Sequence, residues 1–210
     1  MTFFANFKKS ALELKNLRTL CVTALLIALD LALKMLKIYI PPNIKISMAF
    51  VAVSSIGMLF GPTVAGLACV ATDIIGYLMN PDGGFSPLFT VIEVAGGVIY
   101  GCFLYNFKPV KLDFSSGKSF GKSLTSNLTA DLRIIFAKVT VAVLCNLIMT
   151  PAALQLSKGQ FIWEGFAASV SARLIKNAIS VPIEVVILMV ALPAVWAAYN
   201  AVFKKRKTAT

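Results

Sequence analysis

The last long apolar stretch of the chain begins with "SARLIKNAISVPIEVVILMV" at residues 171–190 and carries several polar side chains. At about 100° per residue, five of them share one helix face: Arg173, Lys176, Asn177, Ser180 and Glu184. Charges inside an apolar helix are costly to bury and usually mark a pathway or a binding site. Cations hold carboxylates and a carboxylate accepts N–H groups, so this face suits a ligand that carries both. A structural alternative is that Arg173 and Lys176 extend to the membrane surface while Glu184 pairs with a neighbouring helix.

Polar residues also interrupt the other apolar runs of the chain. Counting residues along each run places them in the outer half of the membrane, where they could face a common site. The expected substrate-binding residues are Lys34, Arg173 and Lys176 as cations, Asp73 and Glu93 as anions, and Asn146, Asn177 and Ser180 as neutral partners. Aromatic rings near the outer ends could cover a flat heterocycle, namely Tyr39, Tyr77, Phe85, Tyr100 and Trp163. Aromatic belts at membrane interfaces produce the same enrichment.

The elements that would position these residues are membrane-spanning helices. The chain has 210 residues, of which 58% are hydrophobic and 14% charged, with a mean hydropathy of +0.83. Apolar runs recur along the chain at lengths of roughly 16 to 25 residues. Helices of this length can cross an apolar layer about 30 Å thick at a rise of about 1.5 Å per residue. We therefore predict an all-α integral membrane protein, a six-helix bundle with spans at 19–38, 46–60, 63–79, 88–105, 133–154 and 170–202.

The distribution of charge predicts the orientation of this bundle. The net charge is +11, but the Lys and Arg residues gather before the first span, between 106 and 133, and in "KKRK" near the end. The positive-inside rule places these segments, and both termini, in the cytoplasm. The charge thus reflects topology in a multi-pass protein of the cell membrane and does not indicate nucleic acid binding.

Three parts of the chain are expected. Residues 1–18 alternate basic and apolar positions at helical spacing, which favours an amphipathic interfacial segment over a disordered leader. Residues 19–203 form the transmembrane substrate-binding domain, and 204–210 a basic cytoplasmic tail. The segment between 106 and 133 is rich in Ser, Gly and Lys and is predicted to be a flexible loop.

Several kinds of chemistry are disfavoured. The sequence contains no His, its four Cys show no CxxC spacing, and it has no phosphate-binding GxxxxGK[ST] motif. We therefore expect no metal, no cofactor and no enzymatic activity, and any ATP hydrolysis would come from a partner. An independent ion-coupled carrier is an alternative, although its usual sign, an inverted repeat, is not evident.

The first span carries a ridge of small residues. Ala24, Ala28 and Ala32 lie within about 80° of arc, the pattern that allows another helix to approach closely. Asp30 and Lys34 lie on the opposite side. The ridge predicts either a docking surface for a partner or ordinary packing within the bundle.

Across nearly its whole length the chain resembles the S component, the substrate-binding subunit, of energy-coupling-factor (ECF) vitamin transporters. The resemblance is carried by "TALLIALDLALK", by "LFGPTVAGLACVATDIIGYLMNPDGGFSPLFTVIEVAGGVIYG" at 59–101 and by "ARLIKNAISVPIEVV". Within that superfamily "YIPPNIKIS", "TDIIGYLMNPDGGFSPLFT" and "RLIKN" are most similar to the folate group.

The resemblance implies a site near the outer face, closed by the loops after the first and third spans. It implies a complex with a transmembrane T component and two cytoplasmic ATPases, in which Ala24, Ala28 and Ala32 pack on the T component. The bundle would then topple in the membrane to release its vitamin inside. Family sites use a carboxylate and an amide, which Glu93 and Asn177 match in type.

Folate suits the predicted residues, because its glutamyl tail has two carboxylates and its pterin ring has N–H groups. Pantothenate and biotin, each with one carboxylate, remain alternatives. Riboflavin and thiamine would leave the cations poorly explained.

Overall fold

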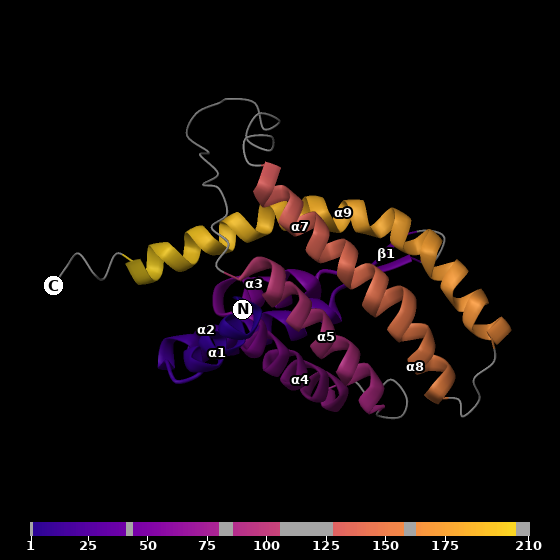
Figure 1. Cartoon of the computed structure of the whole chain (residues 1–210), viewed down its shortest axis with the longest axis horizontal. Helices are drawn as coiled ribbons and strands as arrows, with labels where there is room; N and C mark the ends of the chain where they lie inside the picture. Colours follow the sequence, from indigo (N-terminus) through magenta and orange to yellow (C-terminus); the bar gives the residue numbers. More distant parts are fainter. Residues whose placement is uncertain (1, 41–43, 80–85, 106–127, 158–162, 205–210) are drawn as a thin grey trace.

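The structure of the protein is a computed structural model, which describes residues 2–40, 44–79, 86–105, 128–157 and 163–204 (Figure 1). Helices dominate it, with one short hairpin. In chain order the elements are α1 (Thr2–Glu13), α2 (Leu17–Met35), β1 (Lys37–Ile40), β2 (Ile44–Ser47), α3 (Ala49–Phe60), α4 (Pro62–Met79), α5 (Pro87–Leu104), α7 (Leu128–Val141), the π-helix η1 (Ala142–Met149), α8 (Thr150–Ser157) and α9 (Trp163–Lys204).

The helices α2 to α5 pack as one group. The helices α7, η1 and α8 follow one another as a single rod, which contacts both α5 and α9, and α9 also contacts α3 (Figure 1). Two apolar clusters hold the arrangement together. One, around Tyr100, Leu104 and Leu188, joins α3, α5, α7 and α9. The other, around Ile56, Phe60 and Val64, joins α3 to α4.

Small residues let α5 approach α3 and α4 closely. A methyl group at Gly97 would lie 2.6 Å from the sulfur of Cys69, and one at Gly57 would lie 2.8 Å from the backbone nitrogen of Gly101. A methyl group at Gly101 would collide with the backbone of Pro62. Close backbone packing at small residues is typical of membrane helices, and here it fixes the position of α5.

The break between α3 and α4 is confirmed as predicted. Gly61 adopts a φ of 88°, a conformation that residues with a side chain rarely take, and Pro62 then begins α4. Pro is well suited to the first turn of a helix, because the N–H that it lacks has no partner there.

The connection between the first two predicted spans forms an antiparallel hairpin. Strands β1 and β2 pair in the register Lys37 with Ser47 and Ile40 with Ile44. The predicted ends of the spans, at residues 38 and 46, were therefore wrong, because α2 ends at Met35 and α3 begins only at Ala49. Isolated short strands give a weak sequence signal, since apolar runs of this length also fit helix ends.

Two other predicted boundaries were wrong. The loop was predicted to continue to residue 133, but α7 begins at Leu128. The rest of that prediction, over 106–127, lies outside the described residues. Helix α9 begins at Trp163, well before residue 170, and continues through Pro182 and Pro193. The predicted tail at 204–210 also lies largely outside the described residues.

Four helical segments within the described ranges are long and apolar enough to cross a membrane, namely 62–79, 87–104, 131–157 and 165–203. The pair Asn6–Glu13 and Leu17–Met35, which is bent by 90°, adds a fifth only if the two helices count as one span. Helix α3 has 12 residues and is thus about 18 Å long, short of an apolar layer of about 30 Å. The prediction of a helical membrane protein is confirmed, and the count of six crossings stays a prediction.

Candidate functional site

A cavity of about 840 Å³ opens between α2, α3, α4, α5, α7, η1 and α9. Its volume lies in the range of about 300–1,000 Å³ that is usual for small-molecule sites. Apolar and aromatic side chains form much of the lining, including Phe50, Val53, Tyr77, Phe89 and Tyr100. Six charged residues line it as well: Asp30, Lys34, Asp73, Glu93, Lys138 and Glu184.

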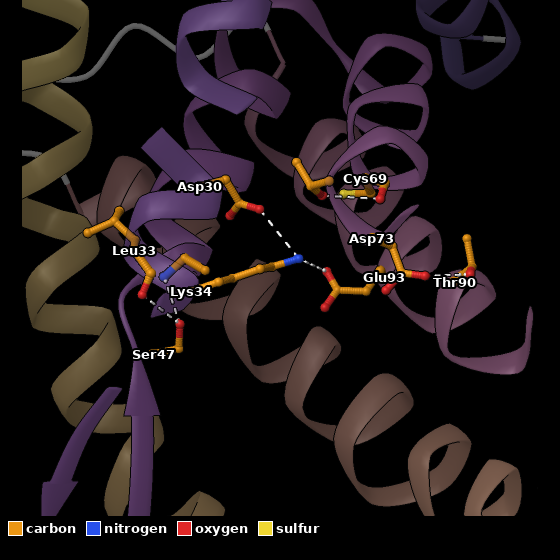
Figure 2. A network of polar contacts seen from close by, with 10 residues as sticks. Asp30, Leu33, Lys34, Ser47, Cys69, Asp73, Thr90 and Glu93 are labelled. Atoms are coloured by element: carbon orange, nitrogen blue, oxygen red, sulfur yellow. Dashed lines mark hydrogen bonds and ion pairs between the residues drawn. The ribbon is translucent and has the colours of Figure 1, made fainter. Parts of the chain in front are cut away.

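One wall of the cavity carries the Lys34 cluster, formed by Asp30, Lys34 and Glu93. The Lys34 nitrogen lies 3.4 Å from an oxygen of Asp30 and 3.5 Å from an oxygen of Glu93, and it reaches between them in Figure 2. Asp30 is fully buried, whereas the side chain of Glu93 is 40% exposed. A single cation thus serves two carboxylates, of which Glu93 is open to a ligand.

Asp73 lies beside this cluster on α4. Thr90 of α5 donates a hydrogen bond of 2.5 Å to a carboxylate oxygen of Asp73 (Figure 2). This bond ties α4 to the first turn of α5 and orients the carboxylate. The second oxygen keeps lone pairs that a ligand N–H group could use.

A second wall carries the Lys138 pair, in which Lys138 of α7 forms an ion pair with Glu184 of α9. Their side chains are only 6% and 14% exposed. The Lys138 nitrogen also lies 4.5 Å from the ring centre of Phe50, a cation–π contact. This pair is balanced in charge and well covered, which distinguishes it from the Lys34 cluster.

The local winding of η1 directs Asn146 and Cys145 to the cavity. Pro151, just after η1, has no N–H to donate to a carbonyl one turn earlier. The turn before it is wound wider, with the backbone N–H and the hydroxyl of Thr150 both donating to the carbonyl of Cys145. Such π-helical turns occur frequently at functional sites.

The formal charge of the lining decides which ligand groups suit it. The described lining contains four carboxylates and two ammonium groups. Two positive and four negative formal charges give it a net charge of −2. Such a lining favours ligand N–H donors over ligand carboxylates. Within the described ranges no group of three His, Cys, Asp or Glu side chains could hold a metal ion.

The sequence model of the family described as ECF-type riboflavin transporter, S component, matches residues 15–194, which is most of the chain. The chain belongs to this family. An S component is a part of a transporter and not an enzyme. The predicted resemblance to S components of ECF transporters is thereby confirmed.

Curated relatives of this S component carry the name folate transporter FolT. One from Clostridium novyi (strain NT) is 29% identical over 175 residues, 83% of this chain and 88% of its own length. Another from Streptococcus mutans serotype c is 30% identical over 189 residues, 89% of this chain and 90% of its own length. A solved structure of FolT bound with folic acid superposes with a TM-score of 0.63 at 30% identity, covering 82% of this chain and 91% of that one.

The structure brings six of the predicted site residues of this S component together around the cavity: Lys34, Asp73, Tyr77, Glu93, Tyr100 and Asn146. The helix 163–204 contributes Glu184 to the lining, but Arg173, Lys176, Asn177 and Ser180 lie outside it. Trp163 is 74% exposed at the first turn of α9. Phe85 and the side chain of Tyr39 lie outside the described residues.

The residues nearest to the cavity on α9 are thus later in the sequence than expected. Ser180 is buried and donates to the carbonyl of Lys176, as serine in a helix commonly does. Arg173 and Lys176 are half-buried, and the buried Nδ2 of Asn177 has no hydrogen-bond partner within the described ranges. A role of these residues in binding stays a prediction.

The expected substrate-binding residues did not include Asp30, Lys138 and Glu184, which line the cavity. Asp30 and Glu184 were noted as charges inside apolar runs, and Lys138 carries the same signal. The pairing of Lys138 with Glu184 could not be found, since no spacing rule relates residues on helices so far apart in the chain. Thr72 and Phe50 carried no signal that distinguishes them from ordinary helix residues.

Proposed function

We propose that this chain is the folate-binding S component of an ECF-type transporter in the cell membrane. The observation that carries the proposal is the match, at 30% identity and a TM-score of 0.63, to a chain solved with folic acid bound. The cavity supports it, because open carboxylates and aromatic rings surround a volume suitable for a flat heterocycle rich in N–H groups.

Glu93 and Asp73 would accept the N–H groups of the pterin ring in this proposal. Both carboxylates line the cavity, and both are held in place by neighbours, Glu93 by Lys34 and Asp73 by Thr90. Tyr77 and Phe89 would flank the ring. The glutamyl carboxylates would then point away from the negatively charged lining, toward the earlier turns of α9.

A direct test is to measure the binding of several vitamins to the detergent-purified chain by calorimetry. Folic acid should bind, and riboflavin, pantothenate, biotin and thiamine should bind at least about tenfold more weakly, a difference of about 1.4 kcal/mol. Because the matching family description names riboflavin, tighter binding of riboflavin would overturn the folate assignment.

The proposal includes six membrane crossings with both termini in the cytoplasm, and a complex with a T component and two ATPases. In this complex the alanine ridge would dock on the T component, and the bundle would topple to release folate inside. Ala24, Ala28 and Ala32 are all exposed on α2, whereas Asp30 on the other side of the same helix is buried. An exposed small-residue ridge supports docking and does not support packing within the bundle.

The docking role can be separated from binding. Ala28→Trp should leave folate binding by the isolated chain unchanged and should abolish uptake in cells, because its bulk prevents close helix approach. Leu29→Trp, which places the same ring at an exposed position of α2 outside the ridge, is the matched control. Loss of binding in the Ala28 variant would mean that the ridge packs internally.

A transport assay separates this proposal from an independent carrier. Proteoliposomes that contain only this chain should bind folate without accumulating it, because the chain has no nucleotide-binding motif. Accumulation driven by a proton or sodium gradient would instead favour an ion-coupled carrier, with the intramembrane carboxylates as coupling sites.

A further inference from the structure

Helix α1 is fixed to the bundle by hydrogen bonds at the turn between α3 and α4. The hydroxyl of Ser10, fully buried, donates to the carbonyl of Phe60 at 2.7 Å and accepts from the backbone N–H groups of Thr63 at 3.0 Å and Val64 at 3.2 Å. The hydroxyl of Thr63 donates in turn to the carbonyl of Phe7 at 3.0 Å. Because the first N–H groups of a helix lack partners within it, Ser10 completes α4 and sets the rotation of α1.

The acidic residue of this region faces inward. Glu13 is the only Asp or Glu among the first 29 residues. Its carboxylate accepts hydrogen bonds from Asn16 and Thr19, each at 3.1 Å, across the bend into α2. Glu13 is half-buried and Thr19 is buried. This arrangement removes the negative charge from the outward face.

The outward face of α1 is cationic with an apolar centre. Lys8 and Leu12 are each two residues from Ser10, so at about 100° per residue they lie on the opposite side of the helix. Both are exposed, as are Lys9 beside them and Lys15 at the bend. Lysines around an exposed leucine are the pattern of helices that lie at a membrane surface.

The bend sets the direction of this face. The axes of α1 and α2 meet at 90°, so if α2 crosses the membrane, as in the function proposed above, α1 lies along the membrane plane. Its leucine would then lie at the boundary of the acyl chains, with the ammonium groups among the headgroups. Anionic headgroups attract such lysines, and neutral headgroups do not.

We propose that Lys8, Lys9, Leu12 and Lys15 form a binding surface for the headgroups of anionic phospholipids. Charge complementarity selects this occupant, since the face presents three cations and its one nearby carboxylate is engaged inward. The proposal adds to the ligand cavity a second, lipid-selective surface at the other end of α2.

Native mass spectrometry of the full chain in detergent tests this surface, with titration of phosphatidylglycerol and phosphatidylcholine as probes. The wild-type chain should retain phosphatidylglycerol in preference to phosphatidylcholine. Replacing Lys8, Lys9 and Lys15 together by Gln should weaken phosphatidylglycerol binding at least about fivefold and leave folic acid binding unchanged. Raised salt should reduce the wild-type preference, because salt screens exposed charges.

The matched control replaces Lys111, Lys118 and Lys122 by Gln, which removes the same charge from the part of the sequence that follows α5. Equal loss of phosphatidylglycerol in both triple variants would overturn the proposal in favour of general surface charge. The proposal would also be overturned if the Lys8, Lys9 and Lys15 variant kept its lipid binding but lost its association with a T component or ATPase. That result would make α1 a protein-binding surface. Because folic acid binding is read separately, its failure would count against the proposed function and not against the lipid surface.

Discussion

The two walls of the cavity use charged residues differently. In the Lys34 cluster one ammonium group lies near two carboxylates, and Glu93 is 40% exposed. In the Lys138 pair one ammonium group meets one carboxylate, and the two side chains are only 6% and 14% exposed. The first wall has an excess of hydrogen-bond acceptors that a ligand can use. The second has its charges satisfied within the protein and joins α7 to α9.

A charge inside a membrane helix therefore does not by itself mark a ligand contact. Burial and the number of partners distinguish a charge that contacts a ligand from one that pairs within the protein. An exposed carboxylate that shares its cation can bind a ligand, whereas a buried pair of opposite charges holds helices together. The two walls should therefore respond oppositely to mutation. The Lys138 pair should affect folding more than binding, and Glu93 should affect binding more than folding.

The largest effect is expected from breaking the Lys138 pair. Glu184→Gln leaves the Lys138 ammonium buried without its counter-ion, which should lower the free energy of unfolding by about 3–5 kcal/mol. The variant should unfold at markedly lower temperature or denaturant concentration in detergent. Binding of folic acid per folded molecule should change little.

The matched control removes both charges. In the Lys138→Met, Glu184→Leu double variant no buried charge is left unpaired, so most of the lost stability should return. If the double variant is stable but binds folic acid much more weakly, the pair contacts the ligand, and the contrast between the two walls fails.

A smaller effect, on binding, is expected at the open wall. Glu93→Gln should weaken folic acid binding by about 1.5–3 kcal/mol, because a hydrogen bond to a charged acceptor is lost. Its effect on unfolding should be below about 1 kcal/mol, since the side chain is substantially exposed and Lys34 keeps Asp30 as a partner. Calorimetry and denaturant unfolding of the same preparation measure both quantities. If a folded Glu93→Gln chain binds folic acid with unchanged affinity, Asp73 and not Glu93 binds the pterin ring. The variant Asp73→Asn tests that alternative.

The sequence predicted the helical elements better than the contacts between them. Apolar length and the Gly61–Pro62 break identify the helices, since both follow from local chemistry. Lys34, Asp73 and Glu93 were found because intramembrane charge is rare, and all three line the cavity. Whether such a charge is open or covered depends on neighbouring helices. Helical periodicity gives the face of a residue but not what packs against it.

Helix α9 shows this limit most clearly. Periodicity placed Arg173, Lys176 and Glu184 on one face, yet only Glu184 lines the cavity. Lys176 precedes Glu184 by about 12 Å along the axis and Arg173 by about 16 Å, at about 1.5 Å per residue. The position of a residue along the helix relative to the cavity is set by tertiary packing, which the pattern of one helix does not contain.

The smallest effect is expected from these two cations, and it separates the ring and the tail of the ligand. The described lining has a net charge of −2, so the glutamyl carboxylates of folate should avoid it and find cations beyond it. Arg173 and Lys176 are half-buried on the turns of α9 that precede Glu184. Partial solvent exposure weakens such a pair, so Arg173→Gln or Lys176→Gln should weaken folic acid binding by about 1 kcal/mol, roughly fivefold in Kd.

The comparison ligand is 6-hydroxymethylpterin, which has the pterin ring and no carboxylate. If the two cations hold the tail, neutralising either should leave the affinity for 6-hydroxymethylpterin unchanged, because only the lost contact differs between the ligands. Glu93→Gln supplies the opposite pattern, since it should weaken both ligands equally. If the cations only support the helix or extend to the membrane surface, Arg173→Gln and Lys176→Gln would reduce both affinities alike, chiefly through loss of folded chain. Titrations of both ligands at matched folded concentration distinguish these outcomes. If the Arg173 and Lys176 variants lose affinity for both ligands equally, the glutamyl tail does not bind at this part of α9.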